Sequence, residues 1–401
     1  MTPLDLPGFV GAVEQELASV LADVRALRRR IHQAPEIGWQ EHRTSAAIVG
    51  ALPGLTVEPI AGTGLLVRTG SAGTPAIGVR AELDALPLAE QTGASFASAT
   101  GVMHACGHDV HMSALVALLR AFALATAATP APAALLGVFQ PSEEASPSGA
   151  VRITETGRLQ EQHLAAMLAV HLHPDVPWGA VTTGEGAVNA GSDSFVLTVT
   201  GAGGHGAYPH RSHDPVLALS QVVVALQQVV SRRTDPMHPT VLSVCRLQAG
   251  SAANVIPTEA LAEGTVRVLI PDDRQEILDL IASVTENTAT AYGCLARVEF
   301  TLGDPPLVND RRLVSAVDPW LDRSGFGAAE PMRSCGSDDF AVYREVAPSL
   351  MMFLGLRGHD GDSYPALHHP AFLPPEDAVE QTARAMLAAY AGAAELIIGT
   401  G

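Results

Sequence analysis

Eight consecutive residues, 104–111, read His-Ala-Cys-Gly-His-Asp-Val-His and bring together one thiol, three imidazoles and one carboxylate. Thiolate and neutral imidazole are ligands that zinc and neighbouring transition metals prefer. In an extended segment alternate side chains point to one face, so we expect Cys106 and His108 to point the same way, with Gly107 allowing a tight turn. The stretch predicts a metal site, although a Cys-x-His pair alone would equally suit a buried cysteine beside a surface histidine.

Two adjacent carboxylates, Glu143 and Glu144, follow within Gln-Pro-Ser-Glu-Glu at residues 140–144. Side chains of adjacent residues diverge, so one carboxylate can bind a metal while the other faces a substrate. Together with the Cys/His stretch, this pair makes a metal centre the favoured interpretation. Ser142 and Ser337 are not expected to be nucleophiles, because no Gly-x-Ser-x-Gly motif surrounds either serine.

Later histidines are further candidate ligands, but their spacing leaves alternatives open. His171 and His173 stand together in Val-His-Leu-His-Pro, and His368 is followed directly by His369. His205 lies in a glycine-rich segment, Gly-Gly-His-Gly. Taken singly, each fits a surface or core histidine more simply than a ligand. A polar turn at 336–340 holds Asp338 and Asp339; one of them touching the site is an alternative, but a helix N-cap is the simpler use.

The elements that would position these residues alternate between helices and strands. Apolar residues at helical spacing predict helices over 8–31, from about 41, over 112–125 and over 375–396. Short apolar runs predict strands over 64–68, 76–81, 134–139 and 167–170. This order indicates an α/β domain with a mixed sheet flanked by helices. Ligand groups would gather at the carboxyl ends of its strands.

A second pattern interrupts that domain. Strands are predicted over 194–200, 240–247, 260–269 and 295–302, with helices over 214–231 and 273–290. The order β-α-β-β-α-β is that of a ferredoxin-like domain. Because ligand-type residues return only near His368, we expect a catalytic domain at 1–190 and 305–401 and an inserted domain at 191–304.

Composition narrows the possible partners and compartment. Of the 401 residues, 47% are hydrophobic and 16% charged, as in a well-buried globular protein. A formal net charge of -18, with every basic side chain an arginine, argues against nucleic acid or an anionic membrane as partner. The four scattered cysteines suit a reducing compartment. No signal peptide or transmembrane helix is visible, so we expect a cytoplasmic protein.

The chain resembles the metal-dependent aminoacylase and carboxypeptidase family, in the branch of hippurate hydrolases and plant indoleacetyl-amino-acid hydrolases. His171 matches in its His-x-x-Pro setting, and the other matching segments run along nearly the whole chain in the expected order. They are 29–36, 80–87, 104–111, 140–144, 203–210, 253–257, 264–267, 336–340 and 367–368.

The resemblance implies two divalent metal ions per chain and a homodimer formed through the inserted domain. The implied metal ligands are Cys106, His108, Glu144, His171 and His368. The resemblance thus selects His171 over His173 and His368 over His369, and it assigns Glu143 as general base. The branch usually has Asp where this chain has Glu82, so the extra methylene is expected to shift a contact to the Cys106 stretch.

The expected reaction is hydrolysis of the amide bond of a small N-acyl amino acid by metal-activated water. His205 is a candidate donor to the oxyanion, and Asn254 and Arg267 are candidates for binding the substrate carboxylate. For Arg267, pairing within its own domain is an equal alternative. Zinc is the first choice of metal, with manganese, cobalt and nickel as alternatives. A dipeptidase or carboxypeptidase of the same family, or a non-catalytic metal-binding homologue, are the alternative functions.

Overall fold

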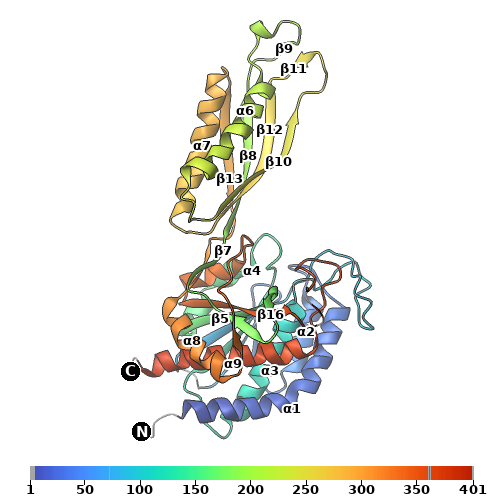
Figure 1. Cartoon of the computed structure of the whole chain (residues 1–401). Helices are drawn as coiled ribbons and strands as arrows, with labels where there is room; N and C mark the ends of the chain where they lie inside the picture. Colours follow the sequence, from blue (N-terminus) through green and yellow to red (C-terminus); the bar gives the residue numbers. More distant parts are fainter. Residues whose placement is uncertain (1–4, 72, 360, 362, 400–401) are drawn as a thin grey trace. The chain divides into compact units, whose positions relative to one another are not determined.

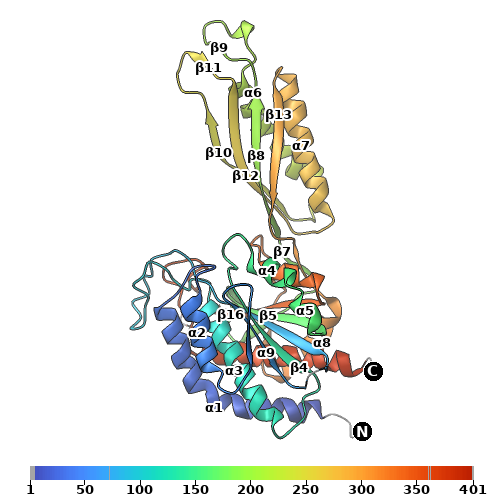
Figure 2. The same cartoon turned by 180° about the vertical axis from the view of Figure 1, so that it is seen from behind.

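A computed structural model describes residues 5–71, 73–359, 361 and 363–399, and it divides the chain into two compact units. The first unit holds the chain up to Gly186 together with Val308–Met332 and the chain from Asp339 onward. The second holds Ala187–Leu307 and Arg333–Asp338. From the sequence, Arg333–Asp338 was expected in the catalytic domain with the rest of 305–401, because a short turn has no periodic pattern that would assign it to the second unit. Figures 1 and 2 show the elements of each unit from opposite sides.

The first unit is built on an eight-stranded mixed sheet in the order β1-β2-β4-β3-β5-β16-β6-β15. Its strands are β1 (Val57–Ile60), β2 (Gly64–Thr69), β3 (Ala76–Glu82), β4 (Ala134–Gln140), β5 (Leu164–Pro177), β6 (Ala180–Thr182), β15 (Gly327–Ala328) and β16 (Ser349–Arg357). The central strands β4, β3, β5 and β16 pair in parallel. Every residue of β3 and β4 is buried, as expected of strands covered on both faces.

Helices cover this sheet. They are α1 (Leu6–Gln33), α2 (His42–Ala51), α3 (His108–Thr126), α4 (Gly149–Glu155), α5 (Arg158–Glu161), α8 (Arg311–Arg323) and α9 (Asp377–Gly399), with a 3₁₀ segment η3 (Asp339–Glu345). α3 packs against α1 and α9, and both α3 and α9 contact the central strand β3. By length and composition α3 and Pro215–Arg233 could each cross a membrane, but 78% of the apolar window of α3 is buried in this core.

The Cys/His stretch is not the extended segment that the sequence predicted. Gly107 has φ +86° and forms the N-cap of α3, which begins at His108 rather than at 112. Glycine enters this left-handed region without the steric cost that a Cβ brings. Cys106 and His108 therefore lie on the two sides of a turn, one before the helix and one in its first turn.

The second unit has an antiparallel sheet in the order β10-β12-β8-β13. Its elements are β8 (Gly191–Thr200), β9 (Gly204–His205), η1 (Pro209–Arg211), α6 (Pro215–Gln228), η2 (Val229–Arg233), β10 (Thr240–Ala249), β11 (Val255–Ile256), β12 (Glu259–Val268), α7 (Asp273–Ala291) and β13 (Leu295–Leu302). β7 (Gly186–Asn189) and β14 (Leu307–Asn309) span the junctions between the units. The main elements follow the predicted β-α-β-β-α-β order, and apolar residues of both helices and the sheet form a separate core.

Candidate metal centre

Three ligand-type side chains converge beside the ends of β3 and β4. The Cys106 thiol, a ring nitrogen of His108 and a carboxylate oxygen of Glu144 lie within 4.8 Å of one another. The His108 Nε2 atom is buried and makes no hydrogen bond within the described residues. An unsatisfied buried polar atom costs about 1–3 kcal/mol, so this donor set fits a bound cation.

Backbone contacts fix the ring orientation of two histidines. His108 Nδ1 lies 2.9 Å from the carbonyl oxygen of Asp84, and His171 Nδ1 lies 2.7 Å from that of Leu172. A carbonyl only accepts, so each Nδ1 carries a proton and Nε2 is the nitrogen that a metal would bind. His171 Nε2 is 3.4 Å from the Cys106 thiol, which joins His171 to the cluster.

His111 lies close to the cluster but its ring is already engaged on both sides. Its Nε2 accepts a hydrogen bond from the backbone N–H of Leu172 at 3.1 Å. Its Nδ1 therefore donates to Glu82 Oε2, 2.8 Å away. Neither nitrogen is left for a metal, although His111, Glu82, His108 and His171 lie close enough to form a second four-residue group. The contact between Glu82 and the Cys106 stretch that the sequence predicted is this bond to His111.

Glu143 and His368 lie at the edge of the group. One carboxylate oxygen of Glu143 is 4.0 Å from His108 Nε2, and Glu144 Oε1 is 4.0 Å from the same nitrogen. His368 Nε2 is 3.1 Å from Glu144 Oε1. The backbone N–H of His368 donates to the carbonyl of Ala105 at 2.9 Å, which ties the C-terminal loop to the Cys/His stretch.

The alternative histidines are engaged elsewhere. The ring of His173 accepts from the backbone N–H of Asp175 at 3.2 Å, and the ring of His369 accepts from that of Ala371 at 3.1 Å. His173 follows His171 by two positions along β5, and both lie beyond the end of the pairing between β5 and β3. β5 does not end at His171, as the sequence predicted, but its pairing with β3 does end just before, at Ala169.

Burial favours the neutral form of the His171 imidazole and the protonated form of the Cys106 thiol. Burial lowers the pKa of His171 well below its usual value, and the neighbouring His111 lowers it further. Burial raises the pKa of the Cys106 thiol well above its usual value, and Glu144 adds to that effect. A metal that binds the thiolate must therefore displace a proton.

The electrostatics around His108 favour a positive charge. Burial alone would lower the pKa of His108, but the nearby carboxylates of Glu82, Asp84 and Glu144 outweigh it and raise the pKa to about 10. These carboxylates surround His108 with negative charge. A divalent cation bound there can take the place of the proton on His108. This is a second observation that fits a metal.

Of the three candidate residues in the second unit, His205 and Asn254 are neighbours, whereas Arg267 has another partner. β9 and β11 pair, with His205 opposite Val255, and the carbonyl of Asn254 accepts the N–H of Gly206 at 2.8 Å. His205 and Asn254 are thus neighbours, and both are exposed. Arg267 donates to the Ser337 hydroxyl at 3.2 Å, a pairing within its own unit.

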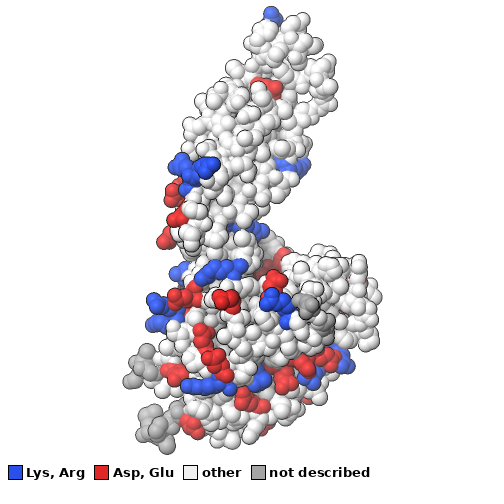
Figure 3. All heavy atoms as spheres, in the orientation of Figure 1, with Lys and Arg blue, Asp and Glu red and all other residues white. Residues whose placement is uncertain are grey.

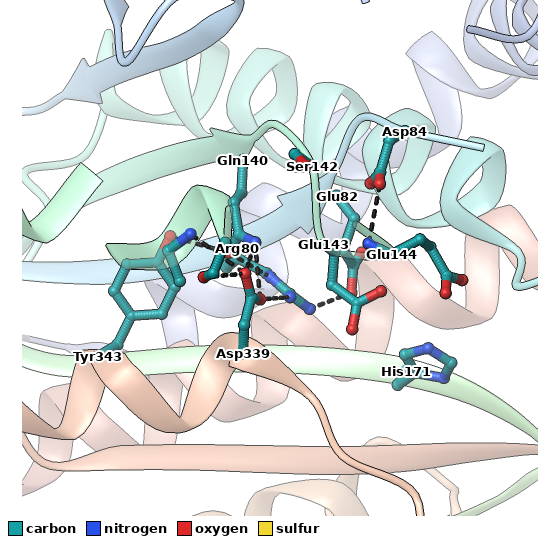
Figure 4. A network of polar contacts seen from close by, with 12 residues as sticks. Arg80, Glu82, Asp84, Gln140, Ser142, Glu143, Glu144, His171, Asp339 and Tyr343 are labelled. Atoms are coloured by element: carbon teal, nitrogen blue, oxygen red, sulfur yellow. Dashed lines mark hydrogen bonds and ion pairs between the residues drawn. The ribbon is translucent and has the colours of Figure 1, made fainter. Parts of the chain in front are cut away.

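Several residues of the site were not expected to have a role. Arg80, Gln140 and Asp339 are fully buried and hydrogen-bonded to one another beneath the loop that carries Glu143 and Glu144 (Figure 4). The alternation of Arg80 and Glu82 along a buried strand was the available signal, because residues two apart share a face. For Asp339 the sequence favoured a helix N-cap, with a contact to the site as the alternative.

Comparisons with known proteins assign the chain to a family. The sequence pattern of the Peptidase family M20/M25/M40 matches residues 78–391. The chain belongs to this family. The resemblance to this family, the mixed α/β fold and the class of amidohydrolase that the sequence predicted are confirmed.

Relatives of this M20-family chain include two bacterial deacetylases. It is 36% identical to the N-acetyl-L-cysteine deacetylase of Bacillus subtilis, over 90% of this chain and 86% of that protein. It is 33% identical to the N-acetyldiaminopimelate deacetylase of Bacillus licheniformis, over 93% of this chain and 99% of that protein.

Two solved structures are similar over almost their full length. A dinuclear metal binding peptidase of the M20 family from Bacillus subtilis has a TM-score of 0.81 and 29% identity, covering 96% of this chain and 100% of that chain. A putative aminohydrolase from methicillin-resistant Staphylococcus aureus has a TM-score of 0.89 and 32% identity, covering 95% and 98%.

Proposed function

We propose that this M20-family protein hydrolyses the amide bond of small N-acyl amino acids. The observation that carries the proposal is the buried group of Cys106, His108 and Glu144, with the carboxylate of Glu143 beside it. The two relatives named above are deacetylases of N-acetylated amino acids, which supports this substrate class. A dipeptidase or carboxypeptidase activity is the alternative, and a non-catalytic homologue would have no use for Glu143.

Two divalent ions per chain are proposed, held by Cys106, His108, Glu144, His171 and His368. The naming of a similar structure as dinuclear supports this number, and the mixed sulfur, nitrogen and oxygen donors suit zinc first, then manganese, cobalt or nickel. Such ions supply Lewis acidity and lower the pKa of a bound water toward about 7.

Glu143 is proposed as the general base. Its carboxylate receives a proton from the attacking water and returns that proton to the nitrogen of the leaving amino acid, so the amide becomes a carboxylic acid and an amine. A positioned base of this kind contributes roughly 10²–10⁴-fold to the rate. Asp84 supports the neighbouring residue, because it accepts the backbone N–H of Glu144 at 2.9 Å.

Substitution of the two adjacent carboxylates tests this assignment. Glu143→Gln should keep its metal content and lose at least about a hundred-fold in kcat, the low end of general-base catalysis. Glu144→Gln should lose metal as well, measured by metal analysis after chelation and reconstitution. Glu155→Gln, at an exposed side chain of α4, is the control and should behave as wild type. Metal loss from Glu143→Gln with retention in Glu144→Gln would reverse the two roles.

The substrate class is tested by a panel of N-acetyl, N-benzoyl and long-chain N-acyl amino acids beside dipeptides. Preference for dipeptides would favour the alternative, and metal-independent hydrolysis would contradict the proposal. On the face shown in Figure 3, acidic and basic side chains are interspersed on the described part of the first unit, without one broad basic area. The formal net charge of -18 argues against nucleic acid or an anionic membrane, so a small molecule is the proposed partner, and the cytoplasm is the proposed location.

His205 is proposed to donate to the oxyanion of a partner subunit in a homodimer. Its Nδ1 accepts the backbone N–H of Ala207 at 3.0 Å, so its Nε2 carries the proton and can donate. Asn254 and Arg267 are proposed to bind the substrate carboxylate.

Mixing His205→Ala with Glu143→Gln, both inactive alone, tests the action of His205 across subunits. Activity should return to about a quarter of wild type when subunits exchange, because half the dimers are mixed and each has one complete site. No recovery despite exchange would mean that His205 acts within its own chain. A fully active His205→Ala would remove any catalytic role.

A further inference from the structure

A buried polar network lies beneath the loop that carries the proposed base and ligand, and its centre is Asp339. The loop, residues 141–148, connects the end of β4 to α4 and contains no regular helix or strand. Asp339 is 1% exposed, and it reaches the loop from η3, almost two hundred residues later in the sequence. Figure 4 shows Arg80 and Gln140 converging on its carboxylate.

The Asp339 carboxylate accepts hydrogen bonds at both ends of the loop. At the β4 end, Gln140 Nε2 lies 2.7 and 2.9 Å from its two oxygens. At the α4 end, the Ser148 hydroxyl donates at 2.7 Å and the backbone N–H of Ala150 at 3.2 Å. One side chain therefore holds the start and the finish of the segment that contains Glu143 and Glu144.

Arg80 extends this network toward the histidines. Its Nη2 donates to Asp339 at 2.9 Å, its Nε donates to Gln140 Oε1 at 3.0 Å, and its Nη1 pairs with Glu82. Glu82 in turn holds His111, which accepts the backbone N–H of Leu172, the residue after His171. The contacts run without a break from the Glu loop to the strand that carries His171.

The four groups bonded to Asp339 in these contacts are all donors: Arg80, Gln140, the Ser148 hydroxyl and the backbone N–H of Ala150. Gln140 has no freedom to change this, because its Oε1 already accepts from Arg80 and from the Tyr343 hydroxyl at 2.9 Å, which turns its NH₂ toward Asp339. Only a carboxylate, with acceptors on both oxygens, satisfies the four donors. An amide in its place would set an NH₂ group against a donor in either orientation.

We propose that Asp339 is a positioning residue for the hydrolytic site, holding the loop so that Glu143 and Glu144 keep their places relative to His108 and His171. The inference rests on the proposed function for its kinetic consequence, but not for its effect on metal binding. A misplacement of about 1 Å can cost roughly a hundred-fold in rate, so a group that touches neither substrate nor metal can still control the reaction.

The test is Asp339→Asn, which preserves shape and removes one acceptor. Binding of zinc to the metal-free protein, measured by competition with a chelator, should weaken at least tenfold because Glu144 is displaced. kcat should fall at least tenfold while KM changes less, because Glu143 is displaced but the substrate contacts are not. In the Glu143→Gln background, assayed at saturating zinc so that weaker zinc binding does not contribute, the same substitution should lower the residual kcat less than about threefold, because the base is already lost.

Two further variants separate positioning from stability. Asp193→Asn breaks a buried Asp–Arg pair in the second unit, where Asp193 is bonded by Arg274 at 2.5 and 2.8 Å, and should lower thermal stability without changing zinc affinity. Ser148→Ala removes one donor to Asp339 and should weaken zinc binding a few-fold, while Ser148→Thr keeps the hydroxyl and should restore it. The Ser148 variants also decide the matter if Asp339→Asn does not fold.

Wild-type zinc affinity and kcat in Asp339→Asn, with only a lower unfolding temperature, would overturn the proposal. So would a full, multiplicative loss in the Glu143→Gln background, or an equal loss of zinc affinity in Asp193→Asn. If the wild-type protein hydrolyses none of the substrate panel, the proposed function fails. The comparison of zinc affinities still decides whether Asp339 positions the loop.

Discussion

Replacing Arg80 by methionine should strongly destabilise the first unit. The Arg80 side chain is fully buried between the carboxylates of Glu82 and Asp339, which are 2% and 1% exposed. Methionine fills a similar volume but leaves two carboxylates in the core without their shared cation. Removing one member of a buried ion pair costs about 3–5 kcal/mol, because the remaining charge is desolvated and unpaired.

The expected fall in the unfolding midpoint follows from that cost. One kcal/mol shifts the midpoint of a domain of roughly 150–250 residues by about 2–4 °C, so Arg80→Met should lower it by about 6–20 °C. The assay is thermal unfolding of the chelated protein, so that any loss of metal does not contribute. Arg158→Met is the matched control, because Arg158 also pairs with two carboxylates, Glu58 and Glu161, but is 41% exposed. Its midpoint should stay essentially unchanged.

The pH dependence provides a second check on the same reasoning. Burial alone would raise the pKa of Glu82, but Arg80 and His111 outweigh it and hold the pKa well below its usual value. In wild type this carboxylate stabilises the fold at neutral pH, and that contribution is lost as the pH falls below the unfolded-state pKa. Without Arg80 the pKa rises, so Glu82 takes up a proton earlier and the gap between Arg80→Met and wild type should narrow from pH 8 to pH 5. A gap no larger than that of Arg158→Met, or one that widens on acidification, would refute the argument.

Three further substitutions should change stability, each measured by chemical denaturation of the chelated protein. Tyr390→Phe should cost about 1–3 kcal/mol, because the buried hydroxyl serves both the carbonyl of Ala133 at 2.6 Å and its N–H at 3.2 Å; no change would mean that water replaces it. Gly11→Ala, inside α1 where a Cβ meets nothing within 4 Å, should stabilise by about 0.5–1 kcal/mol, and a loss would reveal a hidden clash. Gly149→Ala would place a Cβ 1.6 Å from the Pro141 carbonyl and should destabilise by at least about 1–3 kcal/mol; wild-type stability would show that the loop can shift freely.

The helices and strands whose apolar residues recur at a regular spacing were predictable from the sequence. The apolar residues of α1 recur at helical spacing and are buried, and the strands and helices of the second unit follow the predicted order. β16 was missed, because an apolar run such as Ser349–Arg357 gives no period that separates a strand from a helix. α8 was missed because Pro319 stands inside it, where proline normally interrupts a helix.

The candidate site divides in the same way. Residue type alone was enough to single out Cys106, His108 and the Glu143–Glu144 pair. The structure brings them together, as the resemblance implied. The choice of His171 over His173 needed the resemblance, because the two histidines stand two positions apart on one strand and spacing alone does not choose between them. For Asp339 the sequence favoured a helix N-cap over a contact with the site. Its hydrogen-bond network could not be predicted, because most of its partners are distant in sequence.

The order of the proposed ligands along the chain has a consequence for how the protein acquires its metal. Cys106 and His108 are synthesised early, Glu144 and His171 follow, and His368 comes only after the whole of Ala187–Leu307 has been made. Closing a loop of that length must precede the last contact, so the coordination shell is among the final features of folding rather than its nucleus. A chain still on the ribosome can offer a passing ion only part of the full donor set. Selection of the correct metal is therefore deferred until synthesis is complete, and a nonsense mutation before His368 would leave the earlier ligands unable to complete the site.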